Sequence, residues 1–292
     1  LSSHTTANDN TAVGQSALRS NTTATNNATV GSGAGYAITT GTENVGMGKN
    51  ALRFVTTGSF NTALGGESQF GTTTASTNTS VGYYSLYTNS TGANNTAMGA
   101  NALDANTTAS NNVAFGAAAL GSNTTATYNT AVGTNAMTAT TTGGQNTAMG
   151  YNALAAHTEG TGNTAFGIGA SATITTGSYS TAIGYTAATV NTQPSIVAVG
   201  YNALTANTTG YFNTAVGHSV LPANTTGINN VGVGGGTIEA NTTGSNNTGV
   251  GWNALKANTT ASNNVAFGSG ALDANTTGAN LVAIGTSALG AN

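Results

Sequence analysis

Apolar and polar positions repeat along the chain with a period of seventeen residues. A glycine marks each repeat, as at Gly14, Gly31 and Gly48, and an apolar residue precedes it in every copy. One interval, between Gly184 and Gly200, is a residue shorter, and the spacing then resumes. A fixed short period is typical of a solenoid, in which each coil buries its apolar side against neighbouring coils. The pattern therefore predicts a single β-solenoid repeat domain of seventeen coils over residues 1–292.

Each coil is predicted to contain a short strand just before the repeat glycine. The consensus coil reads N-T-A-V-G-Y-N-A-L-x-A-N-T-T-G-x-N, with a β-branched Thr or Val two residues before the apolar position. Side chains alternate along a strand, so these two positions share a face, which we predict to be the buried one. The predicted core column comprises Val13, Met47, Val81, Phe115, Val132, Met149, Phe166, Ile183, Val216 and Phe267. The alanine between the two positions, such as Ala63 or Ala215, is then predicted to face outward against another copy of the chain.

A second apolar position, four residues after the glycine, predicts a second short strand in each coil. It is usually leucine, as at Leu18, Leu103 and Leu204. The Gly, Asn and Asn-Thr-Thr-Gly segments between the strands are typical of turns, because Gly and Asn tolerate positive φ. Two strands and two turns per coil predict an all-β fold, a flattened parallel β-roll with coils about 4.8 Å apart.

The short interval contains Pro194 where other coils carry the turn glycine, in the segment Asn191-Thr192-Gln193-Pro194. The strand positions on both sides keep their phase, with Ile183 and Val199 each preceding a glycine. Turns tolerate deletions better than strands do. We therefore predict that the turn absorbs the missing residue and that the strand ladder continues, with Val199 on the buried face.

Charged residues are few and share a repeat position. Only 4% of the residues are charged, the net charge is −3 and there is no cysteine. The residue after the second apolar position carries six of the charges, which indicates an exposed edge: Arg19, Arg53, Asp104, Glu239, Lys256 and Asp273. So little charge argues against a nucleic-acid partner. No apolar run is long enough to span a bilayer, so no membrane insertion is expected in this segment.

No arrangement of residues predicts an enzyme. The histidines His4, His157 and His218 are far apart, and the acidic residues are scattered through different coils. Neither a metal site nor a carboxylate pair for acid–base catalysis is therefore expected, and nothing would activate a serine or threonine as a nucleophile. No cofactor is predicted.

Two repeated features have alternative interpretations. The position after the repeat glycine is aromatic in several coils, at Tyr83, Tyr151, Tyr185, Tyr201 and Trp252. We interpret these residues as part of an irregular exposed edge, with a row of rings that stack on sugars as the alternative. Asn-x-Thr sequons recur in register, and we interpret them as stacked turn asparagines, with a glycosylated fibre as the alternative. The candidate glycosylation sites are Asn21, Asn106, Asn123, Asn207, Asn224, Asn241, Asn258 and Asn275.

The strand motif N-[TV]-A-[VIMF]-G resembles the repeat of trimeric autotransporter adhesin head domains. The longer unit, as in Asn213 to Leu221 followed by Asn-Thr-Thr-Gly, is similar to repeats of phage and bacterial tail-fibre shafts. The resemblance covers the whole chain and implies a left-handed parallel β-roll with three chains side by side. The coils are longer than those of adhesin heads, and this sequence contains no coiled-coil stalk, membrane anchor or chaperone domain.

The expected function is that of a non-enzymatic shaft or head of a phage tail fibre or bacterial surface adhesin. The resemblance implies a parallel, in-register homotrimer, extracellular on a virion or cell surface, that serves attachment to a host receptor or glycan. A self-assembling extracellular filament with a mechanical role is the alternative. An ice-binding solenoid is a minor alternative, because the adjacent threonines of each Asn-Thr-Thr turn should point to opposite faces. Neither end of the sequence carries a capping element, so we expect an internal segment of a longer fibrous chain.

Overall fold

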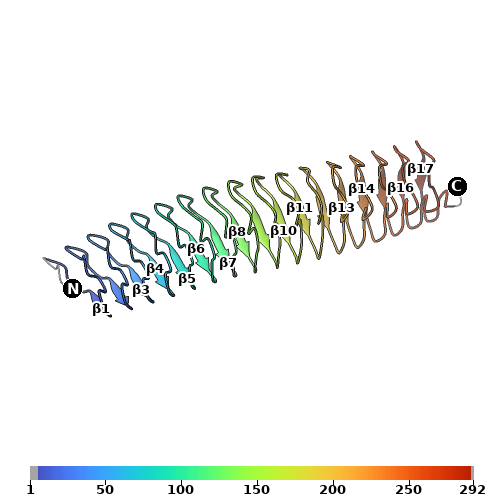
Figure 1. The fold of residues 1–292 in the computed structure, drawn as a ribbon. Coiled ribbons are helices and arrows are strands. Elements are labelled where there is room, and N and C mark those ends of the chain that lie inside the picture. The colour runs from blue at the N-terminus through green and yellow to red at the C-terminus, as the bar shows by residue number, and fades with distance from the viewer. Residues whose placement is uncertain (1–5, 291–292) are drawn as a thin grey trace. The chain divides into compact units, whose positions relative to one another are not determined.

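The computed structural model describes residues 6–290, which leaves His4 outside the described part, and shows a parallel β-solenoid. The chain divides into two compact units, Leu1–Gln145 and Asn146–Asn292. Within each unit the coils stack so that successive strands lie side by side (Figure 1). Among residues 6–290 no segment is helical.

Each strand is three residues long and ends at the residue before the repeat glycine. The first unit contains β1 (Thr11–Val13), β2 (Ala28–Val30), β3 (Val45–Met47), β4 (Thr62–Leu64), β5 (Thr79–Val81), β6 (Thr96–Met98), β7 (Val113–Phe115) and β8 (Thr130–Val132). The second unit contains β9 (Thr147–Met149), β10 (Thr164–Phe166), β11 (Thr181–Ile183), β12 (Val197–Val199), β13 (Thr214–Val216), β14 (Val231–Val233), β15 (Thr248–Val250), β16 (Val265–Phe267) and β17 (Val282–Ile284). The strand positions are those that the repeat predicts.

Equivalent residues of successive coils are paired in parallel register within each unit. In the first unit Val13 is paired with Val30, and Val30 with Met47. In the second unit Thr164 is paired with Thr181, and Phe166 with Ile183. Each repeat position therefore forms a column that follows the stack of coils.

The strand faces are opposite to the sequence prediction. The middle residue of the strand, Ala in most coils, is buried, whereas the residues on either side of it point outward. Leucine side chains from the other layer fill the interior: a Cβ built on Gly46 would lie 3.2 Å from Cδ1 of Leu52. The strand is so close to the leucine column that only a small side chain fits between them, and this explains the alanine.

The leucine column is buried as predicted, but the predicted second strand is wrong. Leu52, Leu103 and Leu204 are fully buried, yet each lies in a turn with φ between 52° and 57°. Leucine in this left-handed region costs roughly 1–2 kcal/mol. Burial of the side chain contributes about 1.5–3 kcal/mol, which is enough to offset the cost. A sequence of turns with inward leucines thus replaces the expected second strand.

The repeat glycine is required by a close approach between coils. Gly65 has φ of 136°, and a Cβ built on it would lie 2.5 Å from the carbonyl oxygen of Gly82 in the next coil. The neighbouring Gly66 has only the ring of Tyr83 within 4 Å of such a Cβ, with the nearest atom at 3.5 Å. The seventeen-residue spacing of glycine therefore reflects one position per coil at which a side chain cannot be accommodated.

A column of buried asparagines, at the residue before most of the strands, links the coils of a unit. Asn44 is fully buried; its backbone N–H donates to Oδ1 of Asn27 (2.9 Å), and its Nδ2 donates to the carbonyl oxygen of Gly58 (2.9 Å). The N–H of Asn61 in turn donates to Oδ1 of Asn44 (3.0 Å). The same pattern joins Asn230 to Asn213 in the second unit. The amide groups of this column are thus paired along the stack, as buried amides need to be.

The short coil is accommodated as predicted, in the turn. β11 and β12 remain in register, with Thr181 paired to Val197 and Ile183 to Val199. Nδ2 of Asn191 donates to the carbonyl oxygen of Gln193 (2.6 Å), which closes the tightened turn. The expectation that Val199 lies on the buried face is wrong, since it belongs to the outward face of its strand.

Candidate interaction surface

The outward face of the strands is an uncharged and largely apolar surface within each unit, with threonine at many of its first positions. It consists of the first and third residues of every strand, which we call the strand face. From Thr11 to Ile284 its positions are Thr, Val, Ala, Leu, Met, Phe or Ile, and none is charged. A large exposed apolar patch on a soluble protein usually marks a contact with another molecule.

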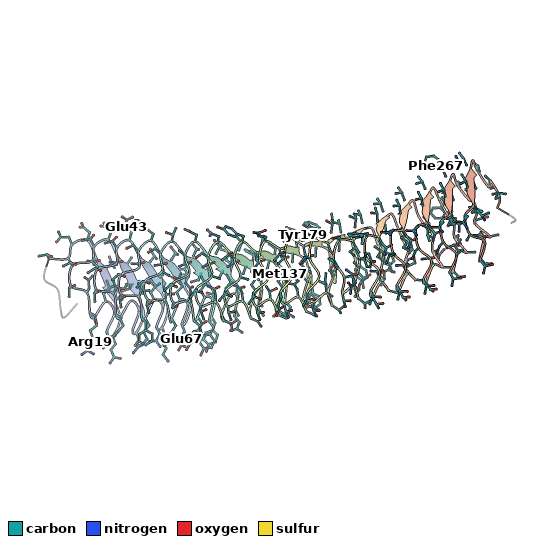
Figure 2. The ribbon with its side chains drawn as sticks, turned by 90° about the horizontal axis from the view of Figure 1, so that it is seen from above. Arg19, Glu43, Glu67, Met137, Tyr179 and Phe267 are labelled. Atoms are coloured by element: carbon teal, nitrogen blue, oxygen red, sulfur yellow. The ribbon has the colours of Figure 1, made fainter. Side chains whose placement is uncertain are left out.

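The residues that the sequence predicted as the core column lie on the strand face instead. Seven of them are between 37% and 57% exposed: Val13, Met47, Phe115, Met149, Phe166, Ile183 and Phe267. Val81, Val132 and Val216 are partly buried. Figure 2 shows the contrast between Met137, which replaces the buried leucine of its coil, and Phe267, which projects from the strands. The prediction that these positions lie on the buried side of the strand is wrong, because they lie on its outward side.

The charged side chains lie outside the strand face, since no strand contains a charged residue. In the first unit Arg19 and Glu67 project from the side away from Glu43 (Figure 2). Within the second unit, Glu239 and Lys256 occupy the same repeat position in successive coils, and their charged groups lie 3.6 Å apart. Both side chains are substantially exposed, as predicted for this position. Charge is therefore kept on the edges and away from the strand face.

Aromatic residues after the repeat glycine are exposed, and some of them stack on one another. Tyr185 and Tyr201 are stacked with ring centroids 5.6 Å apart, and Tyr201 stacks on His218 with centroids 5.1 Å apart. Trp252 occupies the same position two coils after His218 and is largely exposed. The sequence predicted an exposed edge here, and the structure adds ordered stacking within it.

The sequon asparagines are buried, which argues against the glycosylation alternative. Asn21, Asn106, Asn123, Asn207, Asn224, Asn241, Asn258 and Asn275 are at most 2% exposed. In the second unit, Nδ2 of Asn224 donates to Oδ1 of Asn207 (2.7 Å) and to the carbonyl oxygen of Gly227 (3.0 Å). A glycan on that nitrogen would have to replace hydrogen bonds inside the coil. These residues form a second interior column of amides, and their recurrence has a structural cause.

His157 takes the place of an asparagine in this second column. It is fully buried, and its Nε2 lies 3.4 Å from Nδ2 of Asn163. Burial disfavours the charged imidazolium and lowers the pKa of His157 to about 4, against the smaller opposing effect of a backbone hydrogen bond at Gly160. The ring is therefore neutral at neutral pH, like the amides that it replaces.

The first threonine of each Asn-Thr-Thr turn is engaged with the backbone of the next coil. Oγ1 of Thr107 donates to the carbonyl oxygen of Thr124 (3.1 Å), and Oγ1 of Thr225 to that of Thr242 (3.0 Å). In most of these turns only the second threonine is exposed, as at Thr108 and Thr226, whereas both are exposed at Thr208 and Thr209.

Within residues 6–290 there is no cluster of three or more His, Cys, Asp or Glu side chains able to hold a metal ion. Nor does that part of the chain contain a helix with the length and apolarity needed to cross a membrane. The sequence matches no protein-family profile and no curated protein. Among the described residues, the exposed strand face is the feature that points most directly to a function.

Proposed function

We propose that this chain is a non-enzymatic structural segment of an extracellular attachment fibre, the shaft or head of a phage tail fibre or bacterial surface adhesin. Its strand faces pack together in a parallel, in-register homotrimer of left-handed coils. The observation that carries the proposal is the uncharged, apolar strand face, exposed on a single chain.

The chemistry of the strand face favours a second copy of the same chain as its partner. Each repeat position forms a column in register along a unit, so parallel copies would bring equivalent columns together over many coils. Because the face carries no charge, such contacts would bury no unpaired ion. A cyclic arrangement around an axis along the stack covers the face on every copy. We propose three chains, and not another number, because the repeat resembles that of trimeric adhesin heads.

A matched pair of substitutions tests this assembly. Phe166, on the strand face, and Ile168, two residues later on the edge, are both about half exposed on a single chain. Phe166→Asp should dissociate the trimer, because burying the exposed half of three phenylalanines contributes about 2–4.5 kcal/mol, and the variant places three carboxylates there instead. Ile168→Asp should leave the trimer intact. Both variants should retain the wild-type circular dichroism spectrum, since neither side chain is in the interior of the coil.

The outcome is read from molar mass by light scattering during gel filtration. Equal masses for Phe166→Asp and Ile168→Asp would contradict the strand face as the interface. The cellular role has its own test, in which antibodies against the chain are applied to intact virions and cells of the source. They should decorate thin surface fibres in electron micrographs, and labelling confined to the cell interior would contradict the attachment role.

A further inference from the structure

The second unit has a recess on its edge, between His218, which follows β13, and Trp252, which follows β15. The recess measures 240 Å³, and Glu239 and Lys256 also line it. A shallower groove of 590 Å³ lies beyond the same Glu239–Lys256 pair. Two hollows thus adjoin one ion pair on a single edge of the molecule.

The aromatic row has an exception beside the recess. His218 is covered on one ring face by Tyr201, and in the next coil the equivalent position is Gly235. A Cβ on Gly235 would lie 2.6 Å from Cζ3 of Trp252, so the indole rests directly against this glycine. The indole thus occupies the space that a side chain at position 235 would take, and the recess is bounded by this indole and by His218.

Polar groups complete the lining. Glu239 supplies carboxylate oxygens that accept hydrogen bonds, Lys256 supplies an ammonium that donates them, and Asn253 supplies an amide that does both. Glu239 and Lys256 are paired at 3.6 Å, so the site carries no net charge. The floor of the adjoining groove is apolar, formed by Ala223, Ala240 and Ala257.

We infer that this recess is a binding site for a neutral oligosaccharide. A pyranose ring has a C–H face that packs on the electron-rich face of an aromatic ring, and hydroxyls that need both donors and acceptors. The recess is smaller than the roughly 300–1,000 Å³ of pockets for drug-sized ligands, which suits one sugar unit. The alanine-floored groove receives the next unit, and the ion pair of Glu239 and Lys256 gives an anionic sugar no net electrostatic attraction.

Trp252 provides a direct probe, because it is the only tryptophan in the sequence. Chitotriose, cellotriose and mannotriose are titrated separately into the intact protein, up to about 10 mM, which covers millimolar Kd values. At least one of them should shift and saturate the tryptophan emission, and should protect it from quenching by acrylamide. Sialyllactose serves as the anionic comparison and should have a weaker effect.

Variants that keep the probe locate the site. His218→Ala and Glu239→Gln should each weaken binding at least about tenfold, the equivalent of 1.4 kcal/mol. Tyr151→Ala removes an equally placed exposed aromatic of another coil and should leave binding unchanged. Gly235→Ala displaces the indole and should abolish the emission change, while the far-ultraviolet circular dichroism stays that of the wild type.

The inference would be overturned if no neutral trisaccharide changed the emission, if sialyllactose bound more tightly, or if His218→Ala bound as well as the wild type. The proposed sugar site names the class of ligand that the attachment fibre would bind, and it therefore rests on the proposed function. The recess itself belongs to a single chain. Sugar binding can therefore fail while the trimer forms, and the trimer can fail while sugar binding persists, so the two tests remain separable.

Discussion

Replacing Asn44 by alanine should show that the interior amide column holds the coils together. The Asn44 side chain donates to the carbonyl oxygen of Gly58 and accepts from the N–H and Nδ2 of Asn61. Its removal leaves at least two buried backbone groups, the Gly58 carbonyl and the Asn61 N–H, without their partners. Each such group costs about 1–3 kcal/mol, so we expect a loss of about 2–6 kcal/mol.

The neighbouring residue supplies the control. Glu43 is exposed with φ of 56°, and Glu43→Asn introduces the residue that many coils carry at this position, so its effect should stay within about 0.5 kcal/mol. Hydrogen exchange of the Asn61 amide measures the local opening free energy directly. Thermal unfolding measures the wider effect on coils that depend on their neighbours. Equal exchange at Asn61 in Asn44→Ala and Glu43→Asn would refute the proposed role of the column.

Three further predictions concern the interior and the turns. Gly65→Ala should destabilise the first unit strongly, through its contact with the Gly82 carbonyl, whereas Gly66→Ala should change the melting temperature little; similar melting temperatures would contradict the close-approach argument. Leu154→Ala should cost about 2–5 kcal/mol in the free energy of unfolding, because it empties a fully buried site, and a loss below that range would argue against a packed leucine column. The folded-state pKa of His157 is about 4, below its usual 6.5, so the unfolded chain takes up this proton first as the pH falls. Stability should therefore decline by about 3 kcal/mol between pH 6.5 and pH 4, and His157→Asn, which restores the column residue, should remove that part of the pH dependence of unfolding. An unchanged pH profile in His157→Asn would show that other groups cause the decline.

The repeat predicts the fold because the coils have similar sequences and therefore adopt the same backbone conformation. The period places every strand, sets its register, identifies the leucine column and locates the deletion near Pro194 in a turn. The Glu239–Lys256 pair also follows from the period, because the two residues are one coil apart and share an exposed position.

The direction of the strand faces could not be derived in the same way. Alternation shows that Thr164 and Phe166 share a face and that Ala165 does not, but it does not show which face is inside. The more apolar face of a strand is usually the buried one. Here the alanine face is buried instead, because the gap between the strand and the leucine layer admits only a small residue. The inward turn geometry of leucine and the buried asparagine ladders depend on contacts between coils, which sequence spacing alone does not describe.

The candidate sites differ in how far the sequence reveals them. The exposed aromatic edge is visible in the repeat, and the glycine that interrupts it at Gly235 is visible as well. The sequence does not predict that the Trp252 indole lies against Gly235, or that a recess lies between this indole and His218.

We propose that copies of this chain assemble through the exposed strand face, and sedimentation equilibrium of the wild-type protein in native buffer tests this directly. We expect a single species at three times the chain mass of 28.3 kDa, independent of concentration over the measured range. A stable species at 28.3 kDa, with the strand face left in contact with water, would contradict it.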